Sequence, residues 1–207
     1  MLCLTLTLPN RVPAESAEQI VSQLVASLNV HPGAVGPDYA AFEAVGDRQV
    51  QGFLSSADET VGFILSVARS ATWGVHLALL GPSDGCRRVD IESAVQSVRT
   101  SGQRSLTAPG GVIVEFVRDR RVLGAKHAPE LGPIESTLQL LCAIERRRSE
   151  EGQEAGLMIN GGKSQAQTAQ LLGVSQQAVS ARLRAGYWYE SRRVAYWLAE
   201  QIEQLTT

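Results

Sequence analysis

Hydrophobic and polar residues along the first third of the chain follow the two spacings that are typical of strands and helices. Leucine occupies every second position of residues 2–8, which is the period of a β-strand with one buried face. Residues 14–28 carry apolar side chains three and four positions apart, which predicts a helix that packs onto this strand. Residues 39–45 and 48–54 are strand-like runs separated by Gly46 and Asp47, which favours a β-hairpin.

The next segments continue the alternation between helical and strand-like patterns. Residues 57–71 and 90–100 have apolar stripes at helical spacing, whereas residues 73–80 and 111–117 are apolar runs of strand length. The resulting order is strand, helix, strand, strand, helix, strand, helix, strand. This order predicts an α+β fold with a ferredoxin-like split βαβ sandwich, in which helices cover one face of a mainly antiparallel sheet.

A change in composition marks an expected domain boundary near residue 128. Residues 123–132 lose their periodicity and gather glycine and proline, as linkers do. We find no strand pattern beyond them, so we expect an α/β sandwich over residues 1–128 and an all-α domain over residues 129–207. The helices expected in the second domain are 134–148, 164–172, 175–184 and roughly 187–205.

The second domain contains the pattern of a helix-turn-helix in residues 165–184, which read QAQTAQLLGVSQQAVSARLR. Ala169 is small at the point where the first helix approaches the second, and Gly173 stands where the turn needs a positive φ. Val174 follows as an apolar anchor for the turn, and Ser175 is a typical N-cap for the second helix. The pattern therefore predicts two short helices joined by a tight turn.

The predicted second helix has a buried face and an exposed face. Val179 and Leu183 are four residues apart and would pack against Leu172. The opposite face carries amide, hydroxyl, methyl and guanidinium groups, which are able to read base edges in the major groove. The residues predicted to contact bases are Gln176, Gln177, Ser180, Ala181 and Arg184.

Charge supports nucleic-acid binding only locally, because the whole chain has a formal net charge of −2. Residues 163–193 contain five basic side chains and the single acid Glu190, a local charge of +4. Binding to phosphates requires such an excess. The alternative is a helical hairpin that only packs, with glutamines exposed because they are soluble helix formers. The residues predicted to contact phosphates are Lys163, Ser164, Ser175, Arg182, Arg192 and Arg193.

The last predicted helix carries an apolar heptad stripe that needs a packing partner. This stripe can pack on residues 134–144 of the same chain, or on the same helix of a second copy. We favour the homodimer slightly, because a two-fold protein matches a palindromic DNA site. The stripe consists of Trp188, Ala195, Leu198, Ile202 and Leu205, together with Ser191.

Two segments resemble known families. Residues 165–184 resemble the helix-turn-helix of phage repressors of the Cro type and of many bacterial regulators. This resemblance implies a sequence-specific transcriptional regulator whose partner is double-stranded DNA. The element order of the first domain, with Gly46, Asp47, Gln51 and Gly52, resembles nucleotide-cyclase-like domains and SatD-like bacterial proteins. In those proteins a hairpin of this type precedes a C-terminal helix-turn-helix.

The nucleotide-cyclase-like resemblance breaks down at the acidic positions. The first strand ends in Thr7, Leu8 and Pro9 where the family has an acidic residue, and Arg48 replaces the acid after Asp47. Two-metal phosphoryl chemistry needs paired carboxylates to hold the cations. We therefore expect no cyclase activity, no bound metal and no cofactor, and we interpret Asp47 as a turn residue.

The remaining features favour a cytoplasmic protein without enzymatic activity. Cys3, Cys86 and Cys142 lack metal-ligand spacing, so we interpret them as buried thiols in a reducing compartment. No apolar run has the length needed to cross a bilayer, and no motif of a common catalytic class is present. The first domain is expected to sense, to oligomerise or to bind a small-molecule or protein effector. Three alternatives stay open: an adaptor whose helix-turn-helix contacts proteins, a degenerate nucleotide-binding sensor, and an enzyme acting on nucleotides.

Overall fold

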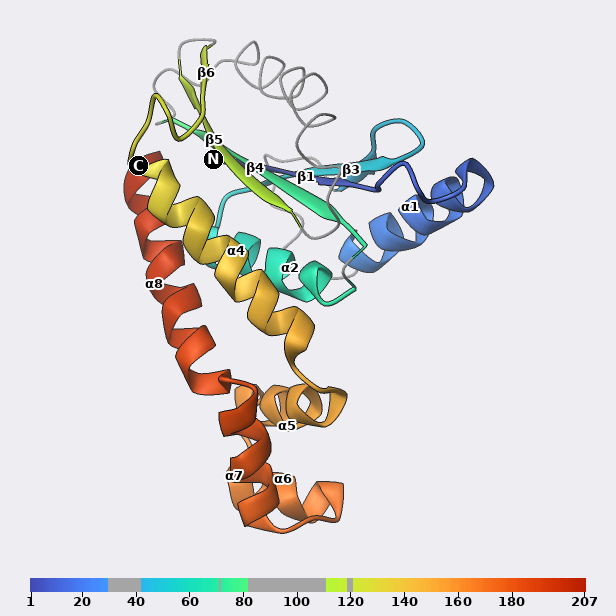
Figure 1. The fold of residues 1–207 in the computed structure, drawn as a ribbon, viewed down its shortest axis with the longest axis vertical. Helices are drawn as coiled ribbons and strands as arrows, with labels where there is room; N and C mark the ends of the chain where they lie inside the picture. The colour runs from blue at the N-terminus through green and yellow to red at the C-terminus, as the bar shows by residue number, and fades with distance from the viewer. Residues whose placement is uncertain (30–41, 71, 82–110, 119–120) are drawn as a thin grey trace.

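The protein has a mixed α+β fold, shown in Figure 1 as a computed structural model. The structure describes residues 1–29, 42–70, 72–81, 111–118 and 121–207. Within these residues six strands form one sheet, and seven helices accompany it. The strands are β1 (Leu2–Thr7), β2 (Glu43–Ala44), β3 (Gln49–Leu54), β4 (Gly74–Leu80), β5 (Val112–Arg118) and β6 (Arg121–Leu123). The helices are α1 (Ala14–Asn29), α2 (Ala57–Ala68), α4 (Leu131–Arg147), α5 (Glu150–Asn160), α6 (Gln165–Leu172), α7 (Gln176–Ala185) and α8 (Trp188–Thr206).

The sheet is mixed, with the strand order β2-β3-β1-β4-β5-β6. β1 lies between β3 and β4 and is antiparallel to both, whereas β4 and β5 are parallel. β2 pairs with β3 around Gly46, whose φ of 79° suits a glycine in a tight turn. The predicted hairpin is thus confirmed where the structure describes it, and residues 39–41 lie outside the described residues.

Strand β1 is buried on both of its faces, so the expectation of a single buried face was wrong. Leu2, Leu4 and Leu6 belong to the main hydrophobic core, but Cys3 and Thr5 on the opposite face are buried as well. A central strand can bury both faces when the polar groups it carries are satisfied. The Thr5 hydroxyl meets this condition, because it accepts a 2.9 Å hydrogen bond from Gln51 Nε2 on β3.

Helices α2, α4 and α8 pack against one another on one side of the sheet (Figure 1). Leu138 and Leu141 of α4 and Leu198 and Ile202 of α8 are buried in the same core as the leucines of β1. α4 also protects the edge of β5: Glu135 Oε2 accepts from Val114 N–H and Gln139 Nε2 donates to the Val112 carbonyl.

This packing determines which partner the heptad stripe of the last helix uses. Ala195, Leu198 and Ile202 are buried within the single chain, and Leu205 packs partly against the same core. The stripe therefore takes the intrachain alternative and is not free to pair with a second copy. For the same reason, the expected boundary near residue 128 does not separate two hydrophobic cores, because α4 and α8 complete the core of the sheet.

The sequence patterns missed two described elements. Helix α5 was not predicted, although Ser149 caps it by accepting from Gly152 N–H, and Glu150 and Glu151 lie in its first turn. Its interior glycines, Gly152 and Gly156, weaken the helical pattern. β6 lies between the strand predicted over residues 111–117 and the expected linker, which it overlaps only at Leu123. The helix predicted over residues 90–100 lies outside the described residues.

The two described cysteines are free and buried, in agreement with the prediction. Burial raises the pKa of the Cys3 thiol to about 12, and burial likewise raises the pKa of Cys142 to about 12. Cys86 lies outside the described residues. No helix in the described part of the chain combines the length and apolar character needed to cross a lipid bilayer.

The position of Leu198 in the core gives a direct test of this packing. Replacing Leu198 with alanine should lower the free energy of unfolding by about 2–5 kcal/mol, because it removes buried methyl groups and leaves a cavity. The matched control is Leu140→Ala on α4, where the side chain is 60% exposed and the loss should stay within about 0.5 kcal/mol. Urea denaturation at several protein concentrations measures both. If the loss of stability in Leu198→Ala arose only from a urea midpoint that depends on protein concentration, the packing of Leu198 within the single chain would be contradicted.

Candidate nucleic-acid interface

Helices α5, α6 and α7 project from the ends of α4 and α8 that lie away from the sheet (Figure 1). They have a small hydrophobic core of their own, which α8 joins through its first residue, Trp188. Around this core Ile159, Leu172 and Val174 are partly buried. The buried members are Ala155, Ala169, Val179, Leu183 and Trp188.

The connection between α6 and α7 has the local geometry that the sequence pattern predicted. Gly173 ends α6 in the left-handed region with φ of 65°. The N–H of the next residue, Val174, donates to the Ala169 carbonyl. Ser175 then caps α7 by accepting a 3.1 Å hydrogen bond from Ala178 N–H. Glycine is the residue that takes this conformation without a steric cost, so the turn is short and fixed.

The start of α6 is defined equally well by hydrogen bonds. Ser164 Oγ accepts from Gln167 N–H, and Gln167 Oε1 accepts from Ser164 N–H, which together form a capping box. The N–H groups in the first turn of a helix have no partner within the helix, and the capping serines of α6 and α7 satisfy only some of them. The remaining N–H groups give the start of each helix a partial positive charge. Such helix ends favour anions.

The residues predicted to contact bases lie on the exposed side of α7. Gln176, Gln177, Ala181 and Arg184 are exposed, and Ser180 is partly buried. Val179 and Leu183 point the other way into the small core, where each is at most 1% exposed. The predicted division of α7 into a buried and an exposed face is therefore present in the structure.

Four of the residues predicted to contact phosphates lie on or next to this helix pair. Lys163 is exposed just before the capping serine of α6, and the exposed Ser164 and Ser175 hydroxyls are engaged as caps. Arg182 is partly buried and lies near Glu151 of α5. Glu151 has a lowered pKa, caused first by its own backbone N–H and the Ser149 hydroxyl and to a smaller degree by the charge of Arg182. The charge of Arg182 thus acts on the start of α5.

Arg192, the fifth predicted phosphate contact, is already engaged within the protein. Its guanidinium forms an ion pair with Glu145 Oε1 at the end of α4. The other carboxylate oxygen, Oε2, accepts a 2.6 Å hydrogen bond from Arg148. Glu145 is only 2% exposed and the Arg148 side chain is fully buried, whereas the Arg192 side chain remains 32% exposed. A phosphate contact by Arg192 would therefore compete with its ion pair to Glu145. Arg193, the sixth, is exposed on α8.

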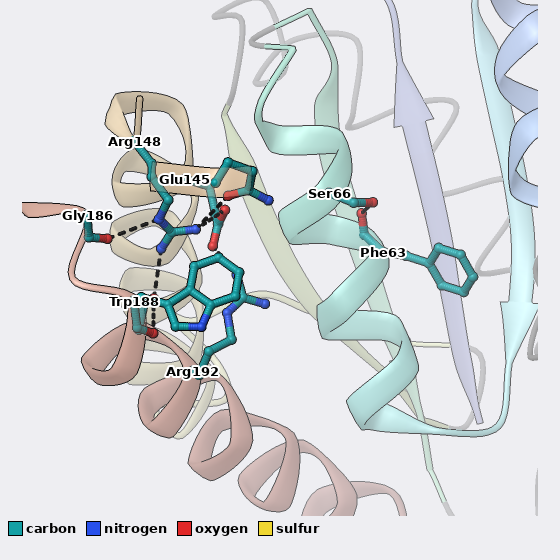
Figure 2. Close-up of polar contacts among 9 residues, drawn as sticks. Phe63, Ser66, Glu145, Arg148, Gly186, Trp188 and Arg192 are labelled. Atoms are coloured by element: carbon teal, nitrogen blue, oxygen red, sulfur yellow. Dashed lines mark hydrogen bonds and ion pairs between the residues drawn. The ribbon is translucent and has the colours of Figure 1, made fainter. Parts of the chain in front are cut away.

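Arg148 is the most highly connected side chain of this group, which we call the arginine cluster (Glu145, Arg148, Trp188 and Arg192; Figure 2). Its Nε donates to the Gly186 carbonyl at 3.0 Å, in the corner between α7 and α8. Its two terminal nitrogens donate to Glu145, to Gln153 of α5 and to Ser191 of α8. One buried guanidinium thereby joins α4, α5, α8 and the end of α7.

Trp188 packs against both cations of the arginine cluster. The guanidinium carbons of Arg148 and Arg192 each lie 4.7 Å from the centre of its ring system, within the range of cation–π attraction. Gly156 of α5 makes room for the indole, since a Cβ at this position would lie 2.1 Å from it. The backbone also turns here, because Tyr187 before α8 has a φ of 48°. The corner that carries α7 is thus held from several sides.

Nothing in the sequence patterns pointed to the arginine cluster. Arg148 belongs to a run of three arginines that resembles a solvated charged face, and Glu145 lies next to that run. The burial of Arg148 follows from its contact with Ser191 on α8, which lies 43 residues further along the chain. The glycine opposite Trp188 was the available signal, because a glycine inside a helix marks a close approach.

The sheet offers fewer candidate groups for chemistry. Asp47 is exposed in the turn between β2 and β3, next to Arg48, as expected of a turn residue. On β4, His76 is buried, and its Nε2 lies 2.9 Å from Glu115 Oε2 on β5. This pairing makes His76 a core histidine with a partner. Among the described residues, no three or more side chains of the metal-binding types come together.

Comparison with known proteins returned no match: no family model fits the chain, and no curated protein or solved structure is significantly similar to it.

Removing the Glu145 carboxylate should weaken the whole cluster. In Glu145→Ala two arginines lose their counter-ion, and Arg148 stays buried, so the free energy of unfolding should fall by about 3–5 kcal/mol. Glu154→Ala on α5, an exposed carboxylate four residues after the helix begins, is the matched control and should cost about 0.5 kcal/mol or less. Chemical denaturation followed by circular dichroism compares the two. Equal stabilities for the two variants would show that the buried ion pairs do not hold this corner.

Proposed function

We propose that this protein binds double-stranded DNA sequence-specifically and acts as a transcriptional regulator, with α6 and α7 as a helix-turn-helix. α7 lies in the major groove in this proposal. The observation that carries it is the division of α7: Gln176, Gln177 and Arg184 are exposed, while Val179 and Leu183 anchor the helix from behind. Amide and guanidinium groups are those that read adenine and guanine edges.

The surroundings of α7 support the same proposal. The starts of α6 and α7 are both open to solvent at their capping serines, Ser164 and Ser175, and a phosphate can bind at either. Lys163 adds a cation beside the first of them. The left-handed Gly173 between the helices is the feature shared with helix-turn-helix proteins of the Cro type, and it favours that relationship.

For the sheet, we propose a ferredoxin-like split βαβ unit formed by β1, α1, β2, β3, α2 and β4. The strand order β2-β3-β1-β4 and the antiparallel pairing of β1 with both neighbours support this assignment. β5 and β6 extend the unit on the β4 side. In a regulator, this part of the chain would receive the signal or the partner that controls DNA binding.

A second candidate function is protein binding through the same helices. Leu157 on α5 and Leu171 on α6 are 57% and 60% exposed, and exposed leucines favour contacts with another protein. They lie on different helices from the exposed face of α7. Substitutions on α7 therefore separate the two functions.

The base contacts can be tested on a site that the protein selects itself. After selection from a pool of random duplexes, Gln177→Ala or Arg184→Ala should weaken binding to the selected site by about 1–3 kcal/mol, which is roughly 5- to 150-fold in Kd. Gln170→Ala, an exposed glutamine on α6, is the control and should leave Kd unchanged. Fluorescence anisotropy at fixed salt measures all three. If the wild-type protein enriches no sequence, or if the α7 variants bind like wild type, DNA reading by α7 is excluded.

The phosphate contacts have a different signature. Lys163→Ala should weaken binding to specific and random duplexes alike, and it should reduce the slope of log K against log salt by about 1, because one fewer counterion is released. Lys126→Ala, an exposed lysine before α4, serves as a charge-matched control. A salt slope that is the same in both variants would remove Lys163 from the interface.

A further inference from the structure

Helix α8 has a second, exposed face, and at its start the Tyr189 hydroxyl accepts a 3.2 Å hydrogen bond from Gln165 Nε2 of α6. The helix runs along one edge of the molecule with α2 and α4 on its inner side (Figure 1). The opposite side carries Tyr189, Arg193, Tyr196, Trp197 and Glu200, all exposed. Their spacing of three, four and seven residues places them on one face of the helix, which we call the outer face. Tyr196 is 62% exposed and Trp197 44%.

The composition of the outer face is typical of a protein contact. Single exposed apolar residues are common, but three aromatic side chains and an arginine on one helical face are the residue types enriched in interfaces. A nucleic acid is a poor occupant of the outer face of α8. The exposed acids of this helix, Glu190, Glu200 and Glu203, outnumber its exposed base Arg193, and phosphates would be repelled.

The order of charges along the outer face makes it complementary to itself. Arg193 and Glu200 are seven residues apart and lie almost in line, separated by about 10 Å along the axis. Tyr196 and Trp197 lie at the midpoint between them. A two-fold axis perpendicular to the helix at this midpoint places Arg193 of each copy opposite Glu200 of the other copy. Two identical ion pairs then flank a centre of four aromatic rings.

We propose that the outer face of α8 binds a second copy of this chain, with the two α8 helices antiparallel. Arg193 faces Glu200 of the partner subunit, and the reverse pair forms on the other side of the axis. Tyr196 and Trp197 pack against the same residues of the copy, in the manner of an isologous interface. This interface leaves the heptad stripe of α8 in the core and is independent of DNA binding.

Charge reversal with rescue tests the proposal on the full-length chain without DNA. Sedimentation equilibrium should give a dimer for the wild type. Arg193→Glu and Glu200→Arg should each weaken association roughly tenfold or more, because each places like charges opposite one another twice. The double variant Arg193→Glu with Glu200→Arg should restore the dimer, since the pairs are then formed in reverse. Glu18→Arg on α1 is the control for a charge reversal outside the interface.

The aromatic centre gives a second measurement. Trp197→Ala should weaken association by roughly 30-fold or more, as central aromatic residues of interfaces do, while the thermal midpoint of the monomer stays close to that of the wild type. A wild-type protein that stays monomeric at all concentrations would overturn the proposal. So would a dimer that is insensitive to Arg193→Glu and Trp197→Ala. Loss of DNA binding in Arg193→Glu with an unchanged mass would instead assign Arg193 to phosphates, as its sequence position predicted.

Discussion

The position of α7 relative to the sheet depends on one buried carboxylate and the two arginines that face it. Glu145 accepts from Arg148 and Arg192, and Trp188 packs against both cations. Burying Glu145 and Arg148 is costly, because each charge loses its hydration, and the attraction between them offsets this only when the geometry is good. Here Arg148 also donates to Gly186, Gln153 and Ser191, whereas the buried Nε of Arg192 has no hydrogen-bond partner. The arginine cluster therefore fixes the positions of α4, α5, α8 and the end of α7 relative to one another.

The consequence for the proposed function is mechanical. α8 is anchored in the core of the sheet by Leu198 and Ile202, and its first turn is anchored in the arginine cluster. α7 ends at Gly186, whose carbonyl is bonded to the same cluster. In the proposed regulator, a shift of α4 or α8 would move α7 and so change how α7 contacts DNA. Rigid support of α7 also reduces the conformational entropy that would be lost when α7 binds DNA.

Local signals predicted much of the fold, and long-range contacts account for what they missed. The helix pair at residues 165–184 was recognisable because its constraints are local: a glycine with positive φ, a serine cap at Ser175 and an apolar pair four residues apart. The burial of both faces of β1 was not, because it depends on its central place between β3 and β4. Arg192 was assigned to phosphates from its charge, and its ion pair with Glu145, 47 residues earlier in the chain, was not predicted. α5 was not predicted because Gly156 lowers its helix propensity. This glycine leaves the space that the Trp188 ring occupies.

The central claim is that α7 reads DNA, and recovery of genomic DNA bound to the tagged protein tests it most directly. The experiment compares the wild type with Arg184→Ala at one stated salt concentration, because the salt sets the nonspecific background. The account predicts discrete peaks that share a sequence motif and disappear in the variant. Featureless recovery from the wild type, or peaks that survive in Arg184→Ala with the same motif, would contradict it.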